Sequence, residues 1–244
     1  MRVKLTIAYD GTDYCGWQVQ PNGVTIQGKL NEALSDLFHT DISTIGASRT
    51  DSGVHALGNV AVFDTDSRMP AEKIAYALNE RLPHDIVIQK SEEVSPDFHP
   101  RFAKTRKVYE YRILNRTFPD PLLSRYTYFF HRDLDACLMN KEAQTLVGEH
   151  DFTSFASVKS QTNTFVRTIY VISVSRDEED VITIHIEGNG FLYNMVRIIA
   201  GSLIQVGSGQ RQPGFIRQAL EAKDRETAGP TAPPEGLTLV RIDY

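Results

Sequence analysis

The chain has 244 residues but only two cysteines, one tryptophan and no excess of positive charge. Cys15 and Cys137 are far apart and form no C-x-x-C pair, so the sequence indicates neither a disulfide framework nor a zinc site. No apolar run approaches the roughly 20 residues that span a bilayer, and the first residues do not precede an apolar signal core. We therefore expect a reduced, cytoplasmic protein with no membrane partner.

The formal net charge of -5 argues against a protein that coats nucleic acid by bulk electrostatics. Any contact with nucleic acid has to use a local patch, and residues 99–112, termed the basic segment, offer one. Glu110 is the one acid there, and Phe102, Tyr109 and Tyr111 alternate with the cations. These cations are Arg101, Lys104, Arg106, Lys107 and Arg112. Such a mixture suits phosphates and bases. It also suits an edge strand whose charges prevent aggregation, and composition leaves both interpretations open.

The chain has 41% hydrophobic and 23% charged residues, which is typical of a globular protein. Its apolar pattern predicts alternating strands and helices. The predicted strands are 3–8, near 42, 59–63, 85–89, 107–114, 164–175, 181–187 and 237–242. The predicted helices are 25–37, 70–78, 134–146, 195–206 and one that begins at Pro213. The second half repeats the rhythm of the first, so the pattern predicts an α/β protein of two comparable lobes, 1–104 and 105–244.

The eleven residues from Gly46 to Ala56, G-A-S-R-T-D-S-G-V-H-A, are the most informative stretch. Small residues around Asp51 leave room for a bulky group to approach, and the glycines permit a tight turn. A carboxylate placed in this way is suited to catalysis or binding. Asp51 could instead only cap backbone N–H groups in a surface turn, and composition does not separate the two interpretations.

Arg197 is unusual because it lies in the most apolar predicted helix of the chain. A guanidinium group there needs a carboxylate partner, unless it reaches solvent along the helix surface. If the partner is Asp51, the pair keeps that carboxylate ionised and oriented. We expect the Asp51 loop, the strand of Tyr109 and residues 190–197 to meet in a cleft between the two lobes.

Ordered blocks along nearly the whole chain are similar to the TruA family of tRNA pseudouridine synthases. These blocks are Y-D-G-T at 9–12, G-W-Q at 16–18, T-I-Q at 25–27, the Asp51 stretch, F-H-P-R at 98–101, K-V-Y-E-Y at 107–111, G-E-H-D-F at 148–152, A-G-P-T-A-P at 228–233 and E-G-L at 235–237. The resemblance implies two similar ferredoxin-like α/β lobes that share a mixed, mostly antiparallel sheet, with the active-site cleft between them.

The resemblance further implies an isomerase that converts uridine to pseudouridine at positions 38, 39 and 40 of the tRNA anticodon stem-loop. It implies no cofactor and no metal. Asp51 would be the catalytic nucleophile, Tyr109 would stack on the target base, and Arg197 would pair with Asp51. Attack at C1′ of the ribose and removal of a ribose proton both remain open as the role of Asp51.

The resemblance also implies how tRNA is held. A base inside a stem has to be flipped out before a carboxylate can reach its ribose, and Arg49 would hold the flipped nucleotide. Arg101, Lys104, Arg106 and Lys107 are the further candidates for contacts with tRNA. The family acts as a homodimer with tRNA bound across both subunits, so a confined basic strip is sufficient for an acidic chain.

The chain departs from the family pattern at Ser48 and Ser52, where glycine and alanine are common. His55 is interpreted as a structural hydrogen-bonding residue, not a general base. Asp51-Ser52-Gly53 also fits the turn of aspartic proteases, but a second such turn is absent from the sequence. A non-catalytic RNA-binding module is the remaining alternative, although it would have no use for Asp51 or a buried Arg197.

Overall fold

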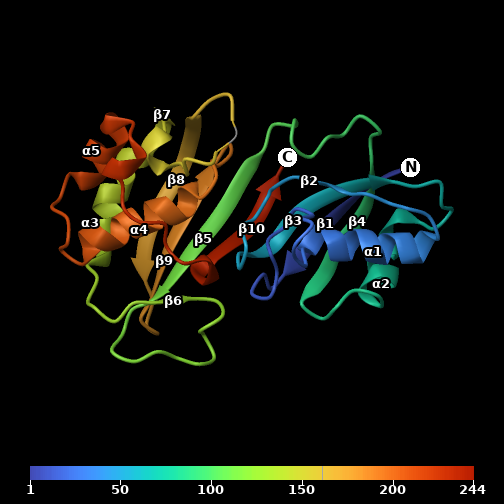
Figure 1. The fold of residues 1–244 in the computed structure, drawn as a ribbon, viewed down its shortest axis with the longest axis horizontal. Helices are drawn as coiled ribbons and strands as arrows, with labels where there is room; N and C mark the ends of the chain where they lie inside the picture. The colour runs from blue at the N-terminus through green and yellow to red at the C-terminus, as the bar shows by residue number, and fades with distance from the viewer. Residues whose placement is uncertain (161) are drawn as a thin grey trace. The chain divides into compact units, whose positions relative to one another are not determined.

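Two units make up the fold of the computed structural model, which describes residues 1–160 and 162–244. The first unit comprises Met1–Lys104 and Thr238–Tyr244, and the second comprises Thr105–Leu237. Each unit contains its own strands and helices (Figure 1). The last seven residues are grouped with the first unit, whereas the sequence pattern placed them in the second lobe.

The first unit is built on strands in the order β4-β1-β3-β10, with the short β2 paired to β3. β1 pairs antiparallel with both β3 and β4, whereas β10 pairs parallel with β3. The strands are β1 (Arg2–Tyr9), β2 (Ile45–Gly46), β3 (His55–Asp64), β4 (Ile86–Val94) and β10 (Leu237–Asp243), and the helices are α1 (Ile26–Phe38) and α2 (Ala71–Asn79).

Strict alternation places one face of β1 in the core of the first unit. Val3, Leu5 and Ile7 are fully buried, and the residues between them are partly exposed. α1 begins after Thr25, whose Oγ1 accepts a hydrogen bond from the N–H of Gly28 at 3.2 Å. Helical spacing then buries the apolar side of α1, which lies beside α2 (Figure 1).

The second unit is built on strands in the order β5-β9-β8-β7, all paired antiparallel, with the short β6 parallel to β5. α4 is buried along most of its length and supplies much of the core. The strands are β5 (Arg106–Leu114), β6 (Tyr128–Phe129), β7 (Gly148–Asp151), β8 (Val166–Arg176) and β9 (Val181–Gly188). The α-helices are α3 (Ala136–Ala143), α4 (Met195–Gly207) and α5 (Phe215–Ala222), and the 3-10 turns are η1 (Gln144–Leu146), η2 (Thr153–Phe155), η3 (Arg225–Thr227) and η4 (Pro234–Gly236).

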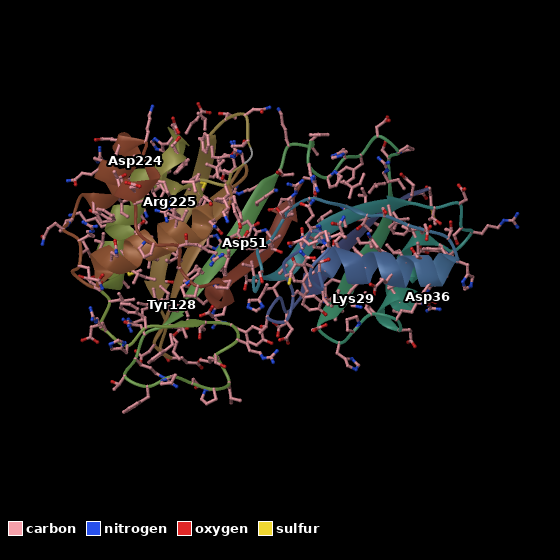
Figure 2. All side chains as sticks on the ribbon, viewed as in Figure 1. Lys29, Asp36, Asp51, Tyr128, Asp224 and Arg225 are labelled. Carbon is pink, nitrogen blue, oxygen red and sulfur yellow. The ribbon has the colours of Figure 1, made fainter. Side chains whose placement is uncertain are left out.

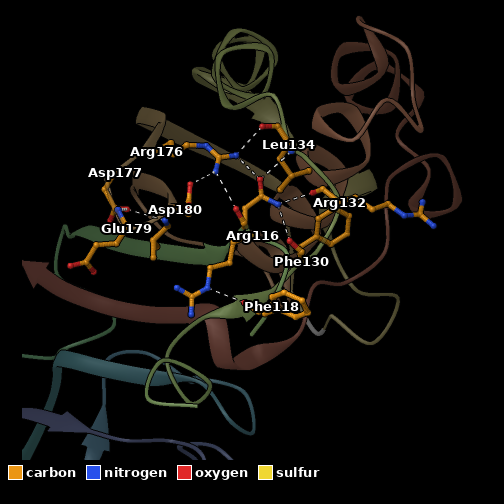
Figure 3. A network of polar contacts seen from close by, with 11 residues as sticks. Arg116, Phe118, Phe130, Arg132, Leu134, Arg176, Asp177, Glu179 and Asp180 are labelled. Atoms are coloured by element: carbon orange, nitrogen blue, oxygen red, sulfur yellow. Dashed lines mark hydrogen bonds and ion pairs between the residues drawn. The ribbon is translucent and has the colours of Figure 1, made fainter. Parts of the chain in front are cut away.

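Hydrogen bonds of Asn115 close the long segment between β5 and α3. Its partners Phe130, Arg132 and Leu134 are labelled in Figure 3. Its Nδ2 donates to the carbonyls of Phe130 and Arg132 at 2.8 and 2.7 Å, and its Oδ1 accepts from the N–H of Leu134 at 3.1 Å. Arg176 donates to both the side chain and the backbone carbonyl of Asn115. These bonds join the two ends of this segment, which also contains the short β6.

The predicted α/β class with a mostly antiparallel sheet is confirmed, but several element bounds differ. Ile42 is buried but lies outside any strand. Its N–H donates to Ser35 Oγ at 2.9 Å and not to a neighbouring strand, and the short β2 follows later. β3 begins four residues before the predicted 59–63, at His55, where it pairs with β10. The predicted helix 134–146 is divided into α3 and η1, and β7 was not predicted.

No helix within the described residues is long and apolar enough to cross a membrane.

Candidate active site

The Asp51 turn, residues 46–54, lies in the first unit and connects β2 to β3 (Figure 2). The N–H of Val54 donates to the carbonyl of Asp51 at 3.2 Å, and Gly53 takes a φ of +77°, which favours glycine. Gly46 to Ser48 and Thr50 are buried, Arg49 is exposed and Asp51 is partly exposed. The turn therefore has a fixed, buried backbone from which Arg49 and Asp51 reach the surface.

The loop that follows β1 supports the turn from its buried side. The Tyr14 carbonyl accepts from Ser52 Oγ at 3.0 Å and from the N–H of Gly53 at 3.3 Å, and the N–H of Trp17 donates to the Thr50 carbonyl at 3.0 Å. Gly16 has a φ of +85°, and a Cβ there would lie 2.7 Å from the Thr50 carbonyl oxygen. The two loops approach too closely for any larger residue at position 16.

A buried hydrogen-bond chain also fixes Thr50. The hydroxyls of Tyr9 and Thr50 lie 2.7 Å apart, and Asn59 Nδ2 donates to the Tyr9 hydroxyl at 3.1 Å and to the Ser48 carbonyl at 3.2 Å. Tyr9 and Asn59 are buried. Because breaking a buried hydrogen bond leaves an unsatisfied polar group, these bonds hold Thr50, the residue next to Asp51, in place.

Tyr14 is itself anchored, because its hydroxyl donates to Asp85 Oδ1 at 2.6 Å. Burial and the neighbouring Asp85 raise the pKa of the Tyr14 phenol, so it stays protonated and able to donate. His55 has the hydrogen-bonding role predicted for it: the N–H of Gly11 donates to its Nδ1 at 3.1 Å in a buried setting. The Asp51 turn is thus held by contacts from β1, from β3 and from the loop after β1, whose Tyr14 is bonded to Asp85 just before β4.

Arg101 lies beside the Asp51 turn. Its position in the sequence did not indicate this proximity. Its Nε donates to the Gly46 carbonyl at 2.7 Å. Partial burial and, to a smaller extent, the positive charge of Arg49 lower the pKa of the Arg101 guanidinium. The two cations are therefore close enough to interact. Lys104, the last residue of this part of the unit, is exposed.

Arg106 and Lys107 lie in the second unit, on β5. Arg106 forms an ion pair with Glu187 and lies over the Tyr170 ring, with its guanidinium carbon 5.6 Å from the ring centroid. His185 lies between Glu187 and Glu110, at 2.9 and 3.2 Å. The basic segment therefore contains two different kinds of arginine: Arg106 is held by a carboxylate, whereas Arg101 is held by a backbone carbonyl.

Tyr109 is buried on β5, opposite Ile186 of β9. Its ring meets Phe191 in a T-shaped contact, with centroids 5.3 Å apart and planes at 83°. Tyr111 lies on the same face of the strand and is fully buried, with its hydroxyl donating to the Pro233 carbonyl at 2.8 Å. The strand and Phe191 together fix the plane of the Tyr109 ring.

Arg197 lies in the first turn of α4, which follows Asn194 in the left-handed conformation. Its Nη1 donates to Asn194 Oδ1 at 3.2 Å and its Nε to the Ala232 carbonyl at 2.7 Å, and the N–H of Ala232 donates back to the Arg197 carbonyl at 3.1 Å. These bonds argue against a side chain that extends freely into solvent. Arg197 and Tyr111 bind adjacent carbonyls of the segment 232–233.

Sequence reasoning did not identify Tyr9, Tyr14 and Asp85 as residues that support the Asp51 turn. Tyr14 and Asp85 are 71 residues apart, and nothing in either local pattern signals their bond. In the described part of the chain, no group of three or more His, Cys, Asp or Glu side chains is arranged to hold a metal ion.

Comparisons with known proteins agree along the chain. A family model described as tRNA pseudouridine synthase matches residues 5–103 and 143–244. A protein of Acetivibrio thermocellus named tRNA pseudouridine synthase A is 48% identical over 242 residues, covering 99% of both chains. Proteins with the same name from Brevibacillus brevis, 47% identical over 243 residues, and from Thermoanaerobacter sp. strain X514, 46% identical over 242 residues, cover 99% or more of both chains.

The fold and the matched residues define a pseudouridine synthase, an enzyme that isomerises uridine in RNA. The identities over nearly the full length go further: the chain belongs to the TruA family of tRNA pseudouridine synthases. It is therefore a tRNA-modifying isomerase.

Proposed function

We propose that this enzyme converts uridine to pseudouridine at positions 38, 39 and 40 of the tRNA anticodon stem-loop, with Asp51 as the catalytic nucleophile. The observation that carries the proposal is the Asp51 turn. Its backbone is held by hydrogen bonds to Tyr14 and Trp17, while Asp51 itself is partly exposed. A fixed backbone reduces the cost of orienting the reacting group.

The reaction rearranges bonds within one nucleotide. The N1–C1′ bond breaks and a C5–C1′ bond forms, while C5 loses a proton and N1 gains one, so no oxidant or cofactor is needed. A carboxylate is anionic at neutral pH, and beside the ribose it either attacks C1′ or removes a ribose proton. Both routes are compatible with Asp51.

Tyr109 and Arg197 complete the proposed site. The released uracil has to turn so that C5 faces C1′, and an aromatic ring holds it by stacking without fixing that rotation. The fixed plane of Tyr109 suits this role. Arg197 pairs with Asp51 and keeps it ionised, and the bonds to Asn194 and Ala232 orient its guanidinium for that role.

The anticodon arm of tRNA is the proposed partner, bound across two subunits of a homodimer in the cytoplasm. Arg49 holds the target nucleotide outside the stem, which offsets a flipping cost of a few kcal/mol. Arg101, Lys104, Arg106 and Lys107 supply further contacts, and of these Arg101 has the strongest support because it lies beside the Asp51 turn.

The test is to incubate the purified enzyme with an unmodified tRNA transcript in the presence of EDTA and to map pseudouridine along the anticodon arm. The proposal predicts pseudouridine at positions 38, 39 or 40, formed without added metal or nucleotide. Formation only outside the anticodon arm would contradict the proposed positions, and tight tRNA binding without product would favour the non-catalytic RNA-binding alternative.

A further inference from the structure

Arg49 belongs to the Asp51 turn, and Arg101 is bonded to the Gly46 carbonyl of that turn, close enough for the positive charge of Arg49 to lower the pKa of the Arg101 guanidinium. Arg101 comes from the segment that follows β4, and its Nε bonds to the carbonyl of Gly46, three residues before Arg49. Arg49 is the exposed residue of the buried run 46–50. Two segments about 50 residues apart in the sequence are thus joined at this point by the Nε bond of Arg101.

Neither guanidinium is paired with a carboxylate among the described residues of the first unit. Two other arginines of that unit have acidic partners: Arg2 pairs with Asp64 at 2.7 Å and Arg81 with Asp36 at 3.0 Å. Arg101 uses one of its five N–H donors on Gly46 and keeps the Nη donors for another acceptor. Two neighbouring guanidinium groups that lack a paired carboxylate repel each other, and an anion bound between them offsets that repulsion.

We propose that Arg49 and Arg101 together bind a single phosphodiester of the RNA strand next to the flipped nucleotide. This inference rests on the proposed function, since it assigns one defined contact at the same site. Guanidinium groups match phosphate geometry and donate in pairs. The Nε bond to Gly46 fixes the Arg101 group relative to the turn, so the bound phosphate also sets the distance between the RNA backbone and Asp51.

Arg106 provides the contrast within the basic segment. Its ion pair with Glu187 already neutralises its charge, and a phosphate would have to displace that carboxylate. We therefore expect Arg49 and Arg101 to bind RNA as one unit. Arg106 should contribute to RNA binding independently of them and by a smaller amount. The difference lies in their partners, because all three side chains are arginines.

The experiment measures binding of an anticodon-arm RNA to Arg49→Gln, Arg101→Gln and the double variant at several salt concentrations. For a single strand, each neutralised phosphate contributes about 0.7 to the slope of log K against log salt. If the two arginines share one phosphate, each single variant and the double variant lose about the same 0.7. Independent phosphates would give roughly twice that loss in the double variant, which would overturn the proposal.

A second measurement identifies the phosphate. Single linkages of the RNA are replaced one at a time by uncharged methylphosphonate. At one linkage the replacement should weaken binding to the unaltered protein several-fold and should not further weaken binding to either single variant. If no linkage behaves in this way for both variants, the shared site is wrong. Pseudouridine mapping with the unaltered enzyme is read separately, so loss of the shared site and loss of the proposed activity remain distinguishable.

Two controls separate phosphate binding from support of the turn. Arg101→Lys keeps the charge but loses the Nε–H that bonds to Gly46, so it should retain the salt slope of the unaltered protein. If Arg101 only supports the turn, the Lys variant should weaken RNA binding as much as the Gln variant does, and no variant should change the slope. Arg68→Gln removes an exposed arginine beyond the far end of β3. A ten-residue strand is about 30 Å long, so this change should alter neither the slope nor the response to any linkage.

Discussion

At the residue scale, the chemistry of this site depends on which side chains are kept small and which are left exposed. Gly46, Ala47 and Ser48 are buried, and the next residue, Arg49, is exposed. Asp51 can be proposed from the sequence because small residues, hydroxyls and one arginine around a carboxylate form an unusual local pattern. The sequence does not indicate that Arg101 bonds to the same turn, since that contact depends on tertiary structure.

Replacing Tyr109 with Phe separates stacking from proton transfer. The ring and its T-shaped contact with Phe191 are retained, so we expect tRNA affinity to change by less than about twofold. If the phenol removes the C5 proton, turnover falls by about 100-fold or more. Single-turnover assays with saturating enzyme measure this step. Full activity of the Phe variant would exclude an essential hydroxyl and leave stacking as the role of Tyr109.

At the element scale, the Asp51 turn is positioned by the loop after β1, and glycine is what allows the close approach. The periodicity of β1 and α1 was sufficient to predict both elements, because each has one apolar face. The connection between them carries no periodicity. Its contacts with residues 50–53 appear only once β1 and β3 are paired.

Gly16→Ala should therefore damage both stability and activity. The new Cβ would lie 2.7 Å from the Thr50 carbonyl oxygen in a residue whose φ is +85°, and we expect a loss of about 2–4 kcal/mol in the free energy of unfolding. Gly209→Ala is the matched control, because its φ is +73° but nothing lies within 4 Å of the added Cβ. That variant should lose only about 1 kcal/mol. Equal losses in denaturant titrations would contradict the close approach at Gly16.

Asp151 gives a pH-dependent prediction in the second unit. Its Oδ1 accepts from the Oγ1 and N–H of Thr153 at 2.6 and 3.1 Å, and these bonds, with the charge of Lys223, hold the pKa of Asp151 below its ordinary value of 3.8. A lowered pKa stabilises the folded state above the ordinary value, and this stabilisation is lost as the pH falls toward the folded-state pKa.

Asp151→Ala should accordingly cost about 1 kcal/mol of unfolding free energy at neutral pH. Chemical denaturation from pH 7 to pH 3 measures the difference between the two proteins. We expect this difference to be constant above about pH 5 and to shrink below about pH 4. A difference that grows on acidification would show that the carboxylate does not stabilise η2 in its ionised form.

At the scale of the whole molecule, the sequence predicted two α/β lobes, and the structure contains two units of mixed α/β composition. The sequence did not indicate that Thr238–Tyr244 is grouped with the first unit, because a strand pattern specifies period and not partner. Parallel pairing of Leu239 with Ala56 places the last strand of the chain beside β3. Gly58 permits that approach, since a Cβ there would lie 2.8 Å from the Val240 carbonyl oxygen.

The proposed homodimer is tested by the mass of the enzyme and of its complex with tRNA. Sedimentation at micromolar protein should give about twice the mass of one chain, and tRNA should bind to this dimer without dissociating it. A net charge of -5 per chain makes binding through bulk attraction unfavourable. A monomer that binds one tRNA with full activity would show that the second subunit is not needed.

The central claim is that Asp51 performs the chemistry and does not merely hold RNA. The most direct measurement compares Asp51→Asn with the unaltered enzyme, using both pseudouridine formation and tRNA affinity. Asparagine keeps the size of the side chain but cannot act as an anionic nucleophile or base. We predict that turnover is abolished while tRNA affinity stays within a few-fold of the unaltered value. Unchanged turnover in the Asn variant would contradict the assignment of Asp51.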